Sequence, residues 1–227
     1  MNATYQFNWS VIDAHMWPML VGLVLMIRLT IVGMVISLAF GLILALMRMS
    51  AARPVRVLAS GVIDVVRSVP LIILLFWLYY GLAAQLGIAM QAFTAGAIAL
   101  GITGSAYMAE VYRGGLEAVE SGQREAAAAM GLTRAVAFQT VVLPQAARLV
   151  VAPTINVFVM LLKGATIMST IGVADMIFVA RQVSLRTFTP FELYTFAGLV
   201  LIVITLILAA IGGVIERRLS KGAGRHA

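Results

Sequence analysis

From Ser68 to Ala109 the chain contains no aspartate, glutamate, lysine or arginine. A membrane-spanning helix needs roughly 20 mostly apolar residues, so this stretch is long enough for two such helices. Of the 227 residues in the whole chain, 62% are hydrophobic and 11% are charged, whereas about 25% are charged in an average soluble domain. A soluble fold of this size would leave much apolar surface in water. We therefore predict an all-α integral membrane protein.

The apolar runs predict about five transmembrane helices, all within one domain that comprises residues 1–227. The boundaries fall where charged, polar or glycine residues interrupt the runs, as Gln85 and Gly87 do between the second and third helices. The predicted spans cover about residues 17–47, 57–84, 91–112, 149–174 and 193–215. The third span is rich in small residues, which let helices approach closely in lipid, so we expect it inside a helix bundle.

Basic residues are distributed unevenly along the chain, which has 16 basic and 9 acidic residues. The first 18 residues contain no lysine or arginine, whereas the tail after the last span contains Arg217, Arg218, Lys221 and Arg225. Basic residues concentrate on the cytoplasmic side of membrane proteins. An odd number of spans places the two ends on opposite sides. We expect the N-terminus outside, and the C-terminus and residues 113–148 in the cytoplasm.

Several kinds of chemistry are excluded by composition. The chain has no cysteine, and its two histidines, His15 and His226, lie near the ends, which excludes thiolate metal sites and a histidine-based catalytic centre in the middle of the chain. Neither Lys163 nor Lys221 follows the glycine pattern of a P-loop, and no D-x-D or H-x-x-H metal pattern occurs. We expect no catalytic residues, no metal site, no cofactor bound by this chain and no nucleic-acid partner.

The polar segment 113–148 contains a predicted short helix. Ser121 is expected to cap its N-terminus, and residues 124–130 are strong helix formers. Gly131 is expected to adopt the left-handed conformation that ends a helix. Such a compact, alanine-rich helix fits a groove on another protein, and an inert linker on the membrane surface is equally compatible with these residues alone.

The same segment contains a spaced pattern. Glu125, Ala126, Ala127, Gly131, Val141, Leu143 and Pro144 follow E-A-A-x3-G-x9-I-x-L-P, with valine in place of isoleucine. This pattern resembles the signature loop of permease subunits of ATP-binding-cassette (ABC) importers. The flanking Gly122 and Gln123, and the run from Arg67 to Leu71, are similar to the polar amino acid branch of that family, and the resemblance covers essentially the whole chain. The fourth span departs from the branch, because Gly164 and Ala165 stand where an acidic and a hydroxyl residue are common.

The resemblance implies a type I importer permease fold and a subunit that imports a polar amino acid or related zwitterion across the bacterial inner membrane. It further implies two copies of a separate ABC ATPase that uses ATP-Mg, a second permease that is identical or similar, and an extracytoplasmic binding protein. The residues implied to couple the chain to the ATPase are Gly122, Gln123, Glu125, Ala126, Ala127, Gly131, Leu143 and Pro144.

Charged residues within the spans are candidates for a substrate pathway. Lys163 lies well inside the predicted fourth span, where a cation would attract the carboxylate of an amino acid. The alternatives are an ion pair with Glu110 or Asp175, or an ammonium group that reaches toward water. Glu110 is also spaced to pair with Arg113 on one helix face. The residues predicted for a pathway or gate are Lys163, Thr166, Arg67, Pro70 and Glu110.

Three other functions compete with that of an importer subunit. A secondary transporter or channel would need no ATPase, but it would leave the pattern between Glu125 and Pro144 without a purpose. A membrane-embedded enzyme would need a nucleophile and base or a metal set, which the sequence lacks. A scaffold that only recruits a partner would hold no substrate.

Overall fold

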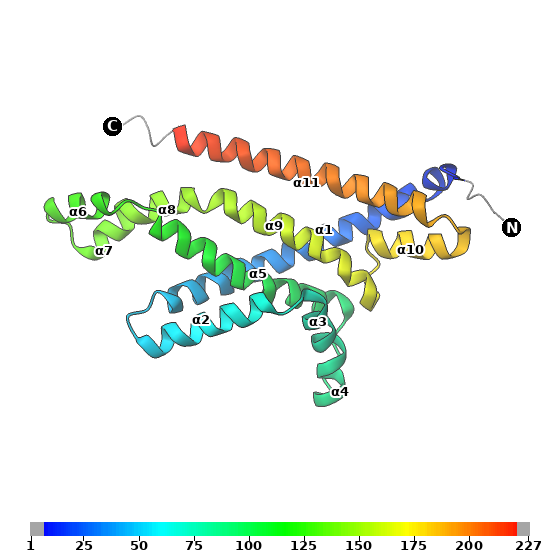
Figure 1. Cartoon of the computed structure of the whole chain (residues 1–227), viewed down its shortest axis with the longest axis horizontal. Helices are drawn as coiled ribbons and strands as arrows, with labels where there is room; N and C mark the ends of the chain where they lie inside the picture. Colours follow the sequence, from blue (N-terminus) through cyan, green and yellow to red (C-terminus); the bar gives the residue numbers. More distant parts are fainter. Residues whose placement is uncertain (1–6, 222–227) are drawn as a thin grey trace. The chain divides into compact units, whose positions relative to one another are not determined.

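The structure is a computed structural model in which residues 7–221 are described, and all regular elements in that part are helices (Figure 1). The prediction of an all-α protein is therefore confirmed. Residues 1–6 and 222–227 lie outside the described part, and they include Arg225 and His226.

The helical elements follow one another in this order: α1 (Ser10–Arg48), α2 (Arg53–Ser68), α3 (Leu71–Phe76), η1 (Trp77–Gly81), α4 (Leu82–Leu86), α5 (Ala92–Glu117), α6 (Ser121–Ala129), α7 (Arg134–Ala137), η2 (Phe138–Val142), α8 (Leu143–Leu149), α9 (Val151–Ala165), η3 (Thr166–Ile171), α10 (Met176–Thr187) and α11 (Pro190–Lys221). Elements η1 and η2 are turns of π-helix, and η3 is a 3₁₀-helix.

Four helical stretches in the described part are long and apolar enough to cross a membrane: α1, α5, the continuous stretch Val151–Ile171, and Pro190–Arg217 of α11. A further pair, Arg53–Ser68 and Leu71–Leu86, qualifies as a single interrupted span. Counting this pair gives five spans, in agreement with the predicted number. The first span begins earlier than the predicted residue 17, because α1 starts at Ser10.

The interruption within the second predicted span lies at Val69 and Pro70. A residue that precedes proline is pushed toward an extended conformation, and Val69 accordingly has φ −81° and ψ 124°. Helix α2 therefore ends at Ser68. The carbonyl of Pro70 then accepts hydrogen bonds from the backbone N–H groups of Ile73 and Leu74, at 3.0 and 3.2 Å, which begins α3.

The chain divides into two compact units. The first comprises Met1–Gly33, Pro70–Leu100 and Met160–Leu206, and the second comprises Met34–Val69, Gly101–Val159 and Ile207–Ala227. The long helices α1, α5, α9 and α11 contribute residues to both units. Each unit is described below by itself.

In the first unit, helices approach closely at glycines. A Cβ atom on Gly22 of α1 would lie 2.7 Å from the backbone carbonyl carbon of Asp175, and one on Gly33 would lie 2.7 Å from the Cβ of Leu100. On α5, Ala95 and Ala99 are fully buried. Small side chains thus allow these helix backbones to pack against their neighbours.

In the second unit, the core forms where α1, α2 and α5 meet. Ala45, Ile63, Ala106 and Ala109 form a buried apolar cluster. Ser37 and Ser105 both donate hydrogen bonds to the carbonyl oxygen of Gly101, at 3.3 and 2.6 Å. Among the four continuous spans, α5 has the largest buried share of its apolar window, 61%. The prediction that this small-residue helix lies inside a bundle is confirmed.

Candidate functional site

The predicted short helix of the polar segment is α6, and it is followed by the left-handed residue Gly131, whose φ is +76°. The N–H of Gly131 donates to the carbonyl of Ala128 at 3.0 Å, and the N–H of Leu132 donates to that of Ala127 at 3.1 Å. These two bonds form a Schellman motif, which satisfies carbonyls that a helix end would otherwise leave unpaired. The expected conformation of Gly131 is confirmed.

The predicted N-terminal cap of this helix is wrong. The cap residue is Glu120, it makes no side-chain cap hydrogen bond, and Ser121 is the first residue of α6. The carbonyl of Glu120 accepts a hydrogen bond from the N–H of Gln123 at 3.1 Å. The helix therefore starts one residue earlier than a serine cap requires, and backbone groups alone close its first turn.

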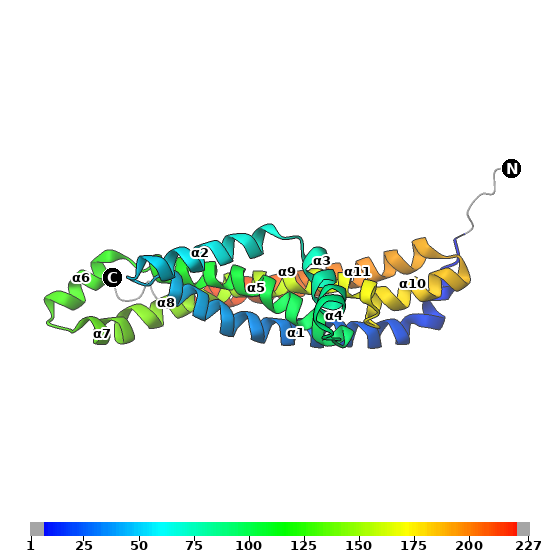
Figure 2. The same cartoon turned by 90° about the horizontal axis from the view of Figure 1, so that it is seen from below.

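Helix α6 and the segment that returns from it form a hairpin, which we call the α6 hairpin (residues 121–149). Elements α6 and α7 lie side by side in both views (Figure 1 and Figure 2). Ala127 is the residue of α6 that packs inward, at 1% exposure. The other predicted coupling residues of this helix, Gly122, Gln123, Glu125 and Ala126, are exposed. The helix thus presents most of its surface outward.

The returning segment contains Leu143 and Pro144 of the sequence pattern, and both are exposed. Proline has no N–H and its ring clashes with the carbonyl four residues earlier in a regular α-helix. The π-helical turn η2 immediately precedes it and provides a wider turn there. Val142 and Ala146 turn inward and pack on Val119. The hairpin is thus anchored by an apolar contact at its base.

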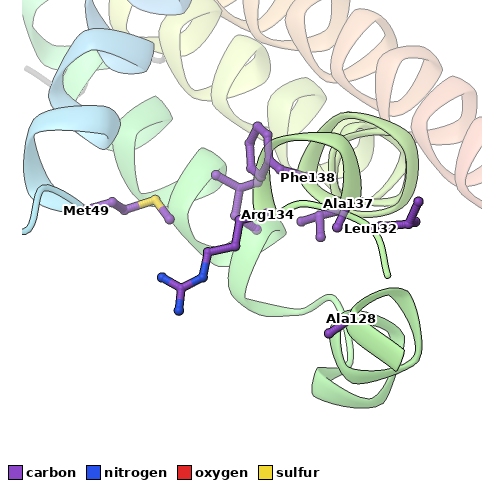
Figure 3. Close-up of a pocket in the computed structure, with 8 residues that line it drawn as sticks. Met49, Ala128, Leu132, Arg134, Ala137 and Phe138 are labelled. Carbon is purple, nitrogen blue, oxygen red and sulfur yellow. The ribbon is translucent and has the colours of Figure 1, made fainter. Parts of the chain in front are cut away.

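An apolar cavity of about 400 Å³ lies beside the hairpin (Figure 3). It is lined by Met49, Leu116, Ala128, Leu132, Arg134, Ala137, Phe138 and Val142. The guanidinium of Arg134 points away from the ring of Phe138. None of the predicted site residues lines this cavity. Sequence reasoning missed it because it forms between segments that are distant in the chain.

Four charged residues at the ends of α1 and α5 form an arginine–glutamate cluster: Arg48, Glu110, Arg113 and Glu117. The predicted pair is confirmed, because Nη2 of Arg113 lies 2.8 Å from Oε2 of Glu110. Glu110 also pairs with Arg48, and Arg113 also pairs with Glu117. Glu110 is therefore bound by two arginines of its own unit. Its place in a substrate pathway stays a prediction.

Lys163 and Thr166 lie where α9 passes into η3, in the first unit. Lys163 is exposed and makes no ion pair within residues 7–221. The hydroxyl of Thr166 donates to the carbonyl of Lys163 at 2.6 Å. An ion pair with Asp175, one of the predicted alternatives, is not formed. The ammonium group therefore keeps its charge available to a ligand or to water.

Arg67 and Pro70 flank the end of α2. The Cζ atom of Arg67 lies 5.3 Å from the ring centroid of Tyr107, in a cation–π arrangement. Pro70 starts α3 through its carbonyl, as described above. The contacts of both residues account for local structure, and a role in the pathway remains a prediction.

Asp175 is a buried acid that sequence reasoning considered only as a partner for Lys163. It is 1% exposed, and its Oδ1 accepts a hydrogen bond from the N–H of Phe178 at 2.8 Å, which caps α10. Its Oδ2 is buried without a hydrogen-bond partner in the described structure. Burial raises the pKa of Asp175 from 3.8 to about 6. An aspartate directly before a helical run is a capping signal that predicts this position.

Comparison with known proteins places this architecture in a family. The profile of the family described as "Binding-protein-dependent transport system inner membrane component" matches residues 37–221. The chain belongs to this family. It is therefore a multi-pass permease subunit of the inner membrane, and the family description implies a substrate-binding protein as a partner. The recognition of an ABC importer permease is confirmed.

Two curated relatives illustrate the branch. The arginine transport system permease protein ArtQ of Bacillus subtilis (strain 168) is 33% identical over 200 residues, which cover 88% of this permease and 91% of that protein. The glutamate/aspartate import permease protein GltK of Escherichia coli O6:H1 is 30% identical over 224 residues, which cover 94% and 99% of the two chains.

Solved structures confirm the type I importer permease fold. A structure described as "Crystal structure of an amino acid ABC transporter with histidines" matches with a TM-score of 0.90 and 36% identity, and covers 94% of this permease and 100% of that chain. An inward-facing MetNI methionine ABC transporter matches with a TM-score of 0.71 and 20% identity, over 91% and 98% of the chains. The second likeness concerns the fold alone.

Proposed function

We propose that this permease is the transmembrane subunit of an ATP-driven importer for a polar amino acid or related zwitterion. We further propose that the α6 hairpin couples it to a separate ATPase. The observation that carries the proposal is the exposed helix α6, which ends in a Schellman motif at Gly131. The coupling residues are Gly122, Gln123, Glu125, Ala126, Ala127, Gly131, Leu143 and Pro144.

The hairpin has the mechanical properties that coupling needs. A ligand-driven closure in one subunit reaches another as a rigid-body shift only if the connecting element does not deform. Both ends of α6 are closed by backbone hydrogen bonds, and the base of the hairpin packs through Val119, Val142 and Ala146. A displacement of α6 would therefore move α8 and the end of α5 with it.

The proposed partners are an ABC ATPase, a second permease and a substrate-binding protein. Hydrolysis of ATP-Mg is assigned to two copies of an ABC ATPase, because the chain has no P-loop of its own. A second permease, identical or similar, completes the pathway, and the binding protein delivers the substrate outside the cell. In this arrangement the α6 hairpin and the C-terminus lie in the cytoplasm and the N-terminus lies outside, which agrees with the distribution of basic residues.

The cargo is assigned by class. The names of the relatives refer to arginine, glutamine, glutamate or aspartate, and cystine, all of which carry an α-carboxylate. Lys163 is an exposed cation without an ion pair in the described part of its unit. We assign Lys163 and Thr166 to the substrate pathway, where the ammonium attracts the α-carboxylate, and we assign Arg67, Pro70 and Glu110 to the pathway or its gate.

Gly131→Asp tests the coupling role. The left-handed backbone at this position favours glycine, and a charged side chain would disturb the turn that follows α6. In proteoliposomes that contain the complete importer and radiolabelled amino acids, we expect transport per ATP hydrolysed to fall about tenfold, within the usual range of a coupling free energy. Membrane insertion should be unchanged.

Gly114→Asp is the matched control, because a Cβ on Gly114 meets no atom within 4 Å and the residue lies outside the hairpin. It should transport normally. Normal transport by a well-inserted Gly131→Asp permease would contradict the proposal. Uptake by the purified chain without ATP would instead favour a secondary transporter or channel.

A further inference from the structure

The cavity beside the α6 hairpin has a buried apolar base. All of its lining residues belong to the second unit. Val142 is 5% exposed, and both Val142 and Leu116 take part in the apolar contact at the base of the hairpin. Small-molecule sites in proteins usually measure roughly 300–1,000 Å³, and this cavity of about 400 Å³ falls at the lower end of that range. It is therefore large enough for one small ligand.

The rim of the cavity exposes two large apolar side chains. Met49, which follows α1, is 45% exposed, and Phe138 of η2 is 40% exposed. Both residues lie outside the candidate membrane spans. Exposed apolar surface that borders a cavity commonly marks a ligand-binding site. The apolar part of a ligand would therefore be covered by the base and the rim together.

One charged side chain lines the same cavity, that of Arg134. It is exposed and makes no ion pair within residues 7–221. Figure 3 shows its guanidinium pointing away from the ring of Phe138. The charge therefore lies at the rim, apart from the apolar walls. A guanidinium donates two parallel N–H groups to a carboxylate or phosphate, so the charged part of a ligand would be an anion.

The cation and part of the apolar wall are presented by one short segment of the chain. Thr133 caps α7 by accepting a hydrogen bond from the N–H of Val136 at 3.4 Å, which makes Arg134 the first residue of that helix. Phe138 and Val142 are the first and last residues of η2. Turns of π-helix occur frequently at functional sites, and here such a turn supplies two walls of the cavity.

We propose that this cavity binds one single-chain amphiphile with an anionic headgroup, of the class of long-chain fatty acid carboxylates. The headgroup pairs with Arg134, and the alkyl chain lies against Phe138 and Leu116. A purely apolar molecule would leave the guanidinium unused, and a small inorganic anion would leave the apolar walls uncovered. A phospholipid would bring a second chain, whereas a cavity of this size favours one.

Such a ligand would contact both arms of the α6 hairpin. Ala128 lies on α6 and Ala137 lies on α7, and both line the cavity. A bound chain would therefore hold the two arms in one arrangement. The inference concerns binding alone, and it does not depend on the hairpin coupling the permease to an ATPase.

Photolabelling of the full-length permease in phosphatidylcholine nanodiscs tests the proposal. The probe is dodecanoate with a diazirine in its chain, and the uncharged comparison is the corresponding dodecanol. We expect saturable labelling by the carboxylate within residues 116–142, located by mass spectrometry of the peptides, and competition by unlabelled dodecanoate. The alcohol should need an about fivefold higher concentration for the same labelling, which is the upper range for one exposed ion pair.

Arg134→Gln should weaken binding of the carboxylate about fivefold for the same reason and should leave labelling by the alcohol unchanged. Arg134→Lys should restore binding, because it keeps the charge. Arg148→Gln is the matched control, since it removes an exposed arginine of α8 that does not line the cavity. It should be labelled as the unchanged permease is.

Ala137→Leu should reduce labelling by both probes about tenfold, because a larger side chain overpacks the site when the ligand is bound. Its matched control is Ala135→Leu, an exposed position of the same short helix that does not line the cavity. This control should be labelled normally. If Ala137→Leu does not fold, the comparison of Arg134→Gln with Arg134→Lys decides the question.

Four results would overturn the proposal. Equal labelling by the alcohol and the carboxylate would show that charge is not recognised. Competition by dioleoyl phosphatidylglycerol as efficient as that by dodecanoate would identify a phospholipid as the occupant. Labelling of the permease alone, but not of the complete importer, would show that a partner subunit fills the cavity. Unchanged labelling in both Arg134→Gln and Ala137→Leu would place the binding site elsewhere.

Discussion

Charged side chains are paired in the arginine–glutamate cluster of the second unit. In residues 163–175 of the first unit they are not. In the cluster, Glu110 pairs with Arg48 and Arg113, and Arg113 also pairs with Glu117. In residues 163–175, Lys163 makes no ion pair within the described structure, and Oδ2 of Asp175 is buried without a partner.

Charges in ion pairs stabilise the fold. Charges without a partner are able to bind a ligand or to change their protonation state. The partly buried pair of Arg48 with Glu110 joins α1 to α5, and removing one partner leaves the other uncompensated. An unpaired lysine on the surface contributes little to stability, and a charged residue within an apolar span is by default a candidate for a functional site. A buried acid without a partner for one oxygen makes stability depend on pH.

The strongest destabilisation is expected from a substitution at Gly22, where α1 packs against the backbone of Asp175. In Gly22→Ala the new methyl group would lie 2.7 Å from backbone atoms of Asp175 and Met176, and backbone atoms cannot move aside. We expect a destabilisation of about 1–3 kcal/mol, toward the upper end. Thermal unfolding of the purified permease in detergent measures it.

Gly115→Ala, close to the cluster on α5, is the matched comparison. Its methyl group would lie 2.3 Å from Cγ1 of Val150, a side-chain atom that Val150→Ala removes. The double variant Gly115→Ala with Val150→Ala should therefore be more stable than Gly115→Ala alone, whereas no side-chain truncation should rescue Gly22→Ala. Equal unfolding temperatures for Gly22→Ala and the unchanged permease would contradict the packing at Asp175.

The next effect is the pH dependence of Asp175→Asn. The folded permease keeps this carboxyl protonated up to about pH 6, whereas the unfolded chain loses the proton near 3.8. The contribution of Asp175 to the stability of the permease should therefore fall as the pH rises from 3.8 to about 6 and stay constant above that. A shift of about two units corresponds to about 3 kcal/mol at most.

Asparagine does not titrate, and its side-chain oxygen can still accept the N–H of Phe178. The unfolding temperature of Asp175→Asn should exceed that of the unchanged permease at about pH 7.5, and the difference should shrink at about pH 4.5. A difference that is constant over this range would show that Asp175 does not titrate in it.

Replacing the unpaired lysine should leave the stability almost unchanged, whereas replacing the paired glutamate should not. Lys163→Gln should change the free energy of unfolding by less than about 0.5 kcal/mol but should strongly reduce uptake by the complete importer. Glu110→Gln should cost about 1–3 kcal/mol, because it leaves Arg48 and part of Arg113 without their partner. Thermal unfolding and uptake assays on both variants check the contrast. Loss of stability in Lys163→Gln with normal uptake would reverse the assignment of these two charges.

Much of the fold could be predicted from the sequence because its determinants are local. Apolar runs define the spans, and a glycine after an alanine-rich run defines the end of α6. A proline within an apolar run disfavours a continuous helix, and the interruption of the second span indeed begins one residue before Pro70, at Val69. The cap at Ser121 was wrong because the residues that precede α6 already close its first turn through the backbone.

The features that were missed depend on contacts between distant segments. Spacing on one helix predicts the pair of Glu110 with Arg113, but Arg48 is 62 residues away from Glu110 in the sequence. Met49 and Phe138 line the same cavity beside the α6 hairpin although they are far apart in the sequence, and no local pattern indicates that. The lack of a partner for Oδ2 of Asp175 likewise follows from what surrounds it in the folded unit.

The π-helical turn η2 has a consequence for the evolution of the α6 hairpin. Such a turn contains one residue more than an α-helical turn would, so each side chain that follows it is rotated by about 100° about the helix axis. Deleting a single residue from Phe138–Val142 would turn Ala146 away from Val119 and bring a different face of α8 inward. The length of this turn therefore sets the rotational phase of the return helix, and we expect insertions and deletions there to be less tolerated than substitutions.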